Sequence, residues 1–175
     1  MPGVALSDAG VAQAARLATR LADDPIDRVV CSPLDRTQAT AEAIGAACGV
    51  SVAVDAGLIE LDMGEWTGRE IEALHGENAW TEWNAHRSTA RIPGGESMVE
   101  AQARIVAVLS HLASAHPGEA IAVVSHSDMI KAAVAHVLGL SLDNLMRFNV
   151  GPASVTRVVW GEWGALLMGL NEECS

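Results

Sequence analysis

AIAVVSHSDMIKAAVAHVLG, residues Ala120 to Gly139, is the stretch that decides the fold. It begins with a short apolar, β-branched run that predicts a buried strand over Ala120–Ser125, and its alanine-rich second half predicts a helix over Ser127–Leu138. His126 lies where the strand ends and the helix begins. Because ligands of open α/β sheets bind beyond the carboxyl ends of the strands, His126 is a candidate binding residue. A lone histidine in such a place is more often a neutral group that caps or packs against its helix.

Strand and helix patterns alternate in the rest of the chain as well. They predict an α/β fold in a single domain over residues 1–175, a three-layer sandwich with a mostly parallel sheet. Residues 56–95 are less regular, contain two short predicted helices, and are expected to cover the cleft. The other expected elements are a helix within Leu6–Asp24 capped by Ser7 or Asp8, strands Ile26–Cys31 and Val50–Asp55, a helix between these strands capped by Ser32 and ended by Gly49, a helix over Ser97–His116 with a Ser97–Glu100 capping box, a short helix near Leu142–Arg147, and strands Ser154–Trp160 and Ala165–Leu170 joined as a hairpin.

The composition limits the classes of partner. The formal net charge of -11 disfavours nucleic acid and anionic membranes, which both bind clustered basic side chains. The three cysteines form no CxxC pair, so zinc and redox motifs are not expected, and no metal or other cofactor is predicted. The sequence shows no leader and no apolar stretch long enough to span a bilayer, which favours a cytoplasmic location.

A second strand end carries an arginine. In CSPLDRTQATA, Cys31–Ala41, the strand ends at Cys31-Ser32 and Arg36 falls in the first turn of the next helix. A helix N-terminus offers free N–H groups and a positive dipole end, and a guanidinium there can bind phosphate through two parallel hydrogen bonds. The alternative is a surface arginine that pairs with Asp35 or Glu42.

A third strand end carries carboxylates. Glu60, Asp62 and Glu65 follow the second predicted strand in the stretch LIELDMGEWTG. A carboxylic acid beside a phosphate site could protonate a leaving oxygen if burial raises its pKa. The alternative is that all three make a loop soluble, and their spacing does not choose among them.

Together these segments resemble the histidine phosphatase superfamily, in its phosphoglycerate-mutase-like branch. They occur in the family's order and cover nearly the whole chain, and five in series are specific although each alone is weak. The matching stretches are LSDAGVAQA (Leu6–Ala14), CSPLDRTQATA (Cys31–Ala41), LIELDMGEWTG (Leu58–Gly68), PGGES (Pro93–Ser97) and VVSHSDMIK (Val123–Lys131).

The resemblance implies a phosphatase or phosphomutase that acts on a small phosphorylated metabolite. A nucleophilic histidine would take the phosphoryl group, and water or a second hydroxyl would discharge the phosphohistidine, with no metal. By position, Arg36 matches the second arginine of the phosphate pocket, His126 the second histidine, and Glu60 the acid. The backbone N–H of Ser127, where many relatives have glycine, would also point at the phosphate.

The resemblance also implies a strand ending in Arg-His-Gly before LSDAG, with the nucleophile and the other arginine. No Arg-His-Gly occurs in the sequence. We therefore expect this chain to lack the family's first strand and the nucleophile, to be inactive as it stands, and to be a piece of a longer, active polypeptide. Unpaired backbone groups beside the absent strand would favour a homodimer.

Two other functions stay open. The chain could be a non-catalytic module that binds a phosphorylated ligand or a partner protein. A serine hydrolase that pairs Ser125 or Ser127 with His126 is the rival from another enzyme class, but neighbouring residues on one turn do not form that geometry and no G-x-S-x-G is present. The sequence does not identify the substrate.

Overall fold

The computed structural model describes residues 3–173, and their elements alternate as the sequence predicts. The predicted bounds agree with the observed ones to within a few residues. The elements are helices α1 (Asp8–Leu21), α2 (Asp35–Cys48), α3 (Ile71–Leu74), α4 (Asn78–Ala85), α5 (Met98–Ala115) and α6 (Ser127–Leu138), strands β1 (Arg28–Cys31), β2 (Val52–Val54), β3 (Ile121–Val124), β4 (Val155–Gly161) and β5 (Gly164–Glu172), and 3₁₀ helices η1 (Ala56–Leu58), η2 (Gly64–Trp66) and η3 (Leu142–Arg147).

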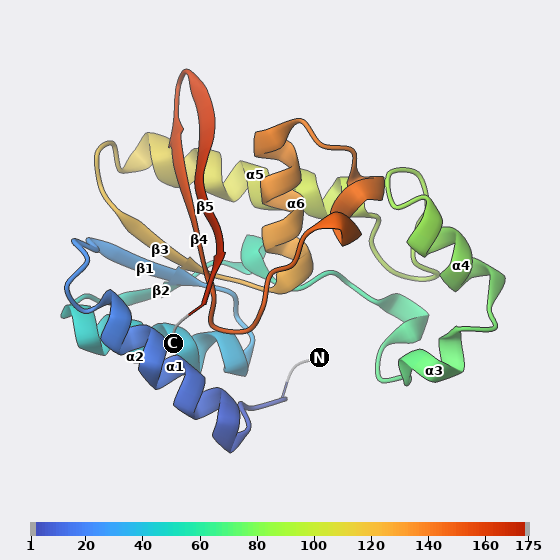
Figure 1. Ribbon diagram of the computed structural model, residues 1–175, viewed down its shortest axis with the longest axis horizontal. Helices are drawn as coiled ribbons and strands as arrows, with labels where there is room; N and C mark the ends of the chain where they lie inside the picture. Colours follow the sequence, from blue (N-terminus) through green and yellow to red (C-terminus); the bar gives the residue numbers. More distant parts are fainter. Residues whose placement is uncertain (1–2, 174–175) are drawn as a thin grey trace.

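The central sheet is parallel, with strand order β2-β1-β3. Val30 in the middle strand lies opposite Ala53 on one side and Val123 on the other. Successive side chains of a strand point to opposite faces, so each strand contributes to two cores. Val30 packs with α5, α6 and the tryptophan-rich segment, whereas Val29 and Cys31 pack with α1 and α2. This arrangement, visible in Figure 1, is the expected α/β three-layer sandwich.

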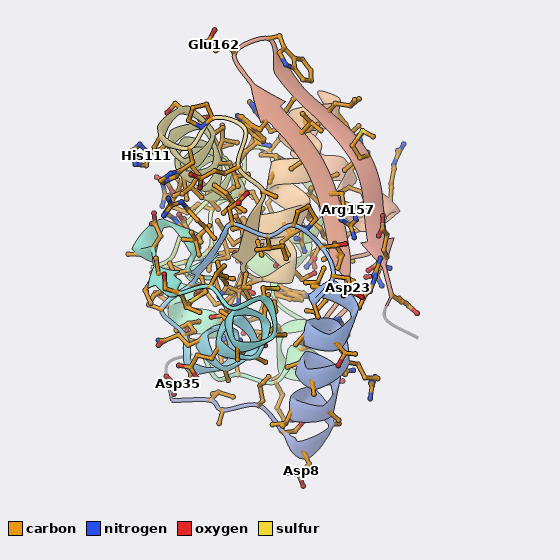
Figure 2. All side chains as sticks on the ribbon, turned by 90° about the vertical axis from the view of Figure 1, so that its left-hand side faces the viewer. Asp8, Asp23, Asp35, His111, Arg157 and Glu162 are labelled. Carbon is orange, nitrogen blue, oxygen red and sulfur yellow. The ribbon has the colours of Figure 1, made fainter. Side chains whose placement is uncertain are left out.

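Strands β4 and β5 form a separate antiparallel hairpin with a two-residue connection, Glu162-Trp163. Its base joins the core shared by α1, α2 and the sheet, because Val155 packs against that cluster, as Ala122 and Val124 of β3 do. Its tip, marked by Glu162 in Figure 2, extends beyond the helices. The sequence predicted this hairpin but not its separation from the parallel sheet.

Within the described residues, strand β3 pairs with another strand on one side only. Ser32 N–H donates to Val124 C=O at 3.0 Å, so Val124 and, by alternation along the strand, Ala122 present their backbone groups to β1. The N–H and C=O groups of Ile121 and Val123 therefore face the other way. Among residues 3–173 no strand pairs with that edge.

The helix-end signals are mostly confirmed, with one correction. Ser7 caps α1, the Ser97–Glu100 capping box begins α5, and Gly49 ends α2 with a φ of 71°. Ser32 does not cap α2, which starts at Asp35 after Leu34. Pro33 extends the chain before the helix, and the Ser32 side chain is used elsewhere, as described below.

Segment 56–95 contains the two short helices expected of it, α3 and α4. Its buried aromatic centre is Trp66, which meets Trp80 and Trp83 edge to face at centroid distances of 5.2 and 6.3 Å. Trp66 and Trp83 therefore belong to the core, and Trp80 packs against it. A cleft-covering role for the segment stays a prediction. Within the described residues, no helix has the length and apolarity needed to cross a membrane.

Candidate functional site

Arg36 and His126 meet because β1 and β3 are parallel neighbours. The turns that follow the two strands leave the sheet at the same edge, so residues after Cys31 lie beside residues after Val124. Arg36 Nη2 lies 3.1 Å from His126 Nδ1. This is the convergence that the proposed phosphate site requires, and it comes from residues 90 positions apart in the chain.

The hydrogen bonds of His126 define its protonation. A guanidinium only donates, so Nδ1 must accept from Arg36. The proton of the neutral ring is then on Nε2, which donates to Ser32 Oγ at 2.8 Å. Burial lowers the pKa of His126 to about 4, and the positive charges of Arg36 and Arg104 act in the same direction. In this structure the imidazole is therefore neutral at pH 7.

Glu60 is the carboxylate that the fold brings to this pair. Its Oε2 lies 3.8 Å from His126 Nδ1, and its Oε1 accepts from the N–H of Leu61 at 3.0 Å. Burial raises the pKa of Glu60 to about 7, and the negative charge of Asp128 acts in the same direction. The hydrogen bond from Leu61 and the positive charge of Arg36 lower the pKa, but they do not outweigh burial. The acid thus holds its proton to near-neutral pH.

The other two carboxylates of this stretch have no contact with His126. Asp62 Oδ1 instead accepts from the N–H of Gly64 at 2.9 Å within its own loop. Glu65 belongs to η2, and its N–H donates to the carbonyl of Pro93. The tertiary structure therefore distinguishes Glu60 from Asp62 and Glu65, which their spacing in the sequence does not do.

Ser127 is the first residue of α6, so its N–H has no partner within the helix. This N–H lies at the positive end of the helix, next to His126. The Ser127 hydroxyl donates to Val150 C=O at 3.1 Å, and Ser125 Oγ donates to Leu58 C=O at 2.8 Å. Neither hydroxyl bonds to His126, which argues against the serine hydrolase alternative.

Ser32 is the site residue that the sequence analysis misassigned. It is fully buried, and its Oγ accepts a hydrogen bond from Nε2–H of His126. A buried hydroxyl cannot meet a substrate, so the contact orients the ring and does not form a nucleophile–base pair. Ser32 could have been found by applying the strand-end argument to every polar residue after Cys31.

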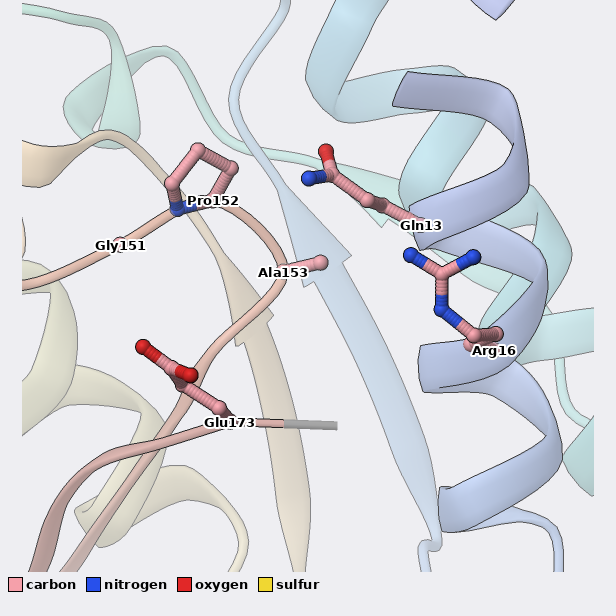
Figure 3. Close-up of a pocket in the computed structure, with 6 residues that line it drawn as sticks. All are labelled: Gln13, Arg16, Gly151, Pro152, Ala153 and Glu173. Carbon is pink, nitrogen blue, oxygen red and sulfur yellow. The ribbon is translucent and has the colours of Figure 1, made fainter. Parts of the chain in front are cut away.

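One surface pocket lies away from Arg36, Glu60 and His126. A cavity of about 220 Å³ opens between α1 and the segment leading into β4, and Figure 3 shows Gln13 and Arg16 facing Gly151, Pro152, Ala153 and Glu173 across it. None of Arg36, Glu60 or His126 lines it. The described part of the chain has no group of three His, Cys, Asp or Glu side chains placed to hold a metal ion.

Comparison with known proteins gives one family. The model of the histidine phosphatase superfamily (branch 1) matches residues 1–173. The probable phosphoglycerate mutase GpmB of Salmonella choleraesuis is 33% identical over 159 residues, which cover 90% of this chain and 74% of that protein. Its counterpart in Erwinia tasmaniensis is 35% identical over 156 residues, with coverage of 88% and 73%.

Solved structures of phosphatases have the same fold as this chain. A mycobacterial glucosyl-3-phosphoglycerate phosphatase in complex with inorganic phosphate superposes with a TM-score of 0.87 at 28% identity, covering 99% of this chain and 92% of that one. The α-ribazole phosphatase of Shigella flexneri superposes with a TM-score of 0.85 at 25% identity, covering 98% and 86%. This protein therefore belongs to the histidine phosphatase superfamily.

Proposed function

We propose that Arg36, His126 and the N–H of Ser127 bind the phosphate group of a small phosphorylated metabolite, with Glu60 as the acid. The observation that carries the proposal is the meeting of Arg36 and His126 at the N-terminus of α6, with Glu60 beside them. A guanidinium, a helix N-terminus and an imidazole supply the donors that a phosphoryl group needs. The phosphorylated substrates of the structural relatives support the same class of ligand.

The hydrogen bond between Arg36 and His126 must break when phosphate binds. His126 Nδ1 accepts a hydrogen bond from Arg36, and an acceptor cannot contact a phosphate oxygen. Arg36 must therefore turn toward the anion, and His126 must gain a proton at Nδ1. The charge of a phosphate dianion favours that imidazolium, while Ser32 can keep accepting from Nε2–H in both states.

The reaction we propose is transfer of the phosphoryl group to a histidine. A histidine nitrogen attacks phosphorus, the bond to the ester oxygen breaks, and Glu60 gives its proton to the departing alcohol. Water then attacks the phosphohistidine and returns a proton to Glu60, or a second alcohol does so in a mutase. Glu60 suits both steps because its pKa is about 7.

We propose that the nucleophilic histidine lies outside residues 1–175, because the sequence contains no Arg-His-Gly. Among the described residues no second histidine contacts Arg36, Glu60 or His126. The free edge of β3 could pair with a further strand that ends in Arg-His-Gly at this site. We propose that such a strand completes the enzyme in a longer, cytoplasmic polypeptide, and that this chain alone binds phosphate without turnover. A non-catalytic phosphate-binding module is the alternative.

Titration with inorganic phosphate tests the binding site. Arg36→Gln should weaken binding at least about tenfold, because a charge-assisted hydrogen-bond pair contributes roughly 1.5–3 kcal/mol. The matched control is Arg91→Gln, which removes an exposed arginine paired with Glu100 away from the site and should leave the affinity unchanged. Equal losses in the two variants would contradict the assignment.

Hydrolysis of p-nitrophenyl phosphate tests the mechanism. Residues 1–175 should give no turnover, and adding a peptide with an apolar strand ending in Arg-His-Gly should restore it, with the phosphoryl group recovered on the peptide histidine. Robust turnover without the peptide, lost in His126→Ala, would place the nucleophile in this chain and overturn this part of the proposal. Binding without rescue by the peptide would favour the non-catalytic module.

A further inference from the structure

The loop that carries Glu60 is held at both ends by neighbouring elements. Glu60 lies between η1 and η2, in a stretch with no regular secondary structure. On one side, Ser125 Oγ at the end of β3 donates to Leu58 C=O at 2.8 Å. On the other, Glu96 N–H donates to Asp62 C=O at 3.0 Å. Each anchor lies two residues from Glu60, so neither fixes the residue itself.

Arg104 of α5 binds the loop next to Glu60. Its Nη1 donates to two carbonyls, those of Gly57 and Ile59, each at 2.8 Å. The Ile59 carbonyl belongs to the peptide bond that joins it to Glu60. Gly57 also lies very close to α5, because a Cβ there would be 2.4 Å from a methyl carbon of Val108. The loop is therefore fastened to α5 at the residue before the acid.

Glu96 holds the guanidinium in place. Its Oε1 accepts from Arg104 Nε at 3.1 Å and its Oε2 accepts from Nη2 at 2.8 Å, a bidentate pair that leaves Nη1 for the carbonyls. The two side chains are only 24% and 16% exposed, so solvent weakens the pair less than it weakens a surface ion pair. Glu96 is part of PGGES, a stretch that otherwise has no assigned role.

We propose that Arg104, oriented by Glu96, is a positioning residue for Glu60: it binds the carbonyls of Gly57 and Ile59 and thereby keeps the Glu60 side chain partly buried beside His126. The role of Glu60 as an acid rests on the proposed function, but the positioning does not. A lysine cannot replace the arginine, because its ammonium group lacks the planar fork that spans a carboxylate and two carbonyls.

Titration of the Glu60 side-chain carboxyl carbon by ¹³C NMR, without phosphate, tests the proposal. Glu60→Gln identifies the signal. The unsubstituted chain should titrate near pH 7. In Arg104→Gln and Arg104→Lys the midpoint should fall by about one to two pH units, because a released Glu60 regains water and the usual pKa of a glutamate.

The sign of the shift separates positioning from charge. Removing a nearby cation would raise the pKa of Glu60, whereas losing its buried position lowers it. Arg91→Lys is the matched control, because Arg91 donates to Gly95 C=O and pairs with Glu100 beside the same loop without touching residues 57–60. Its midpoint should stay near pH 7.

Glu96→Gln gives a second, milder variant if the Arg104 variants do not fold. It removes the charge that orients the guanidinium but leaves an amide oxygen to accept one bond, so an intermediate downward shift is expected. A Glu60 midpoint that stays near 7, or rises, in every folded Arg104 or Glu96 variant would overturn the proposal. Since phosphate takes no part in this measurement, failure of phosphate binding would leave the positioning result intact.

Discussion

At the scale of single residues, Glu60 and His126 respond to the same burial in opposite ways. Burial disfavours the charged form of each group, so the pKa of Glu60 rises to about 7 while that of His126 falls to about 4. Between these values both side chains are neutral in the folded protein. In the unfolded chain, with pKa values of 4.5 and 6.5, both are charged over most of that range.

This pair predicts a compensated pH dependence of stability. Between about pH 4.5 and 6.5 the folded state holds one proton on Glu60 and the unfolded state holds one on His126, so their effects cancel. Glu60→Gln removes the proton that the folded state holds, so only the unfolded state, through His126, binds a proton in this range. The free energy of unfolding should therefore rise with pH, by up to about 1.4 kcal/mol per pH unit. His126→Gln should add a fall with pH instead.

Urea unfolding at pH 4.5, 5.5 and 6.5 measures these slopes relative to the unsubstituted chain. Glutamine suits both substitutions, because it resembles a protonated glutamate and is as neutral as the imidazole it replaces. Slopes of the same sign in the two variants would show that burial does not displace the two groups in opposite directions.

At the scale of elements, β3 is an interior strand on one side and an edge on the other. Its sequence, Ile121–Val124, is a continuous apolar run of the kind found in strands with neighbours on both sides and helices on both faces. Yet all four of its residues remain half-buried, and its second edge has no partner among residues 3–173. The element therefore retains the composition of a central strand without the pairing.

Hydrogen exchange should reveal this asymmetry as an alternating pattern. The N–H groups of Ala122 and Val124 face β1 and should be protected, whereas that of Val123 faces the free edge and should exchange roughly a hundredfold faster or more. NMR-detected exchange of the three amides measures this directly. Equal protection would mean that another segment already covers the edge. A strand-forming peptide that restores turnover should also protect Val123.

At the scale of the whole molecule, the parallel sheet and the β4–β5 hairpin are not joined into one sheet. The hairpin also exposes three large apolar side chains. Leu166 and Met168 alternate along β5, and Val159 of β4 lies opposite Leu166. A strand edge without a partner strand and an exposed apolar surface each favour association. The net charge of -11 on every copy opposes it.

We therefore expect a weak homodimer whose formation depends on salt. Sedimentation equilibrium should show more dimer at high ionic strength than at low, because salt screens the repulsion between two anionic copies and leaves apolar burial intact. The strand-forming peptide should return the chain to monomers by occupying the edge of β3. A monomer at both salt concentrations would contradict this expectation.

The sequence by itself determined the order of elements, the helix ends at Gly49 and Ser97, a cap at Ser7 or Asp8, and the two side chains of the candidate site, Arg36 and His126. These are local properties, since apolar periodicity, capping and strand-end placement each depend on a few neighbouring residues. Membership of the family followed from five short motifs in the right order.

Spacing left three carboxylates open and the family resemblance pointed to Glu60, but only the tertiary structure put Glu60 beside His126. Only the tertiary structure, too, decided that Ser32 orients His126 instead of capping α2, and that Arg104 and Glu96 hold the loop before Glu60. It also decided that the hairpin stays apart from the parallel sheet. The physical reason is the same in each case. Burial and hydrogen-bond partners depend on residues far away in the chain, and a polar side chain takes its role from the neighbours that the fold brings to it.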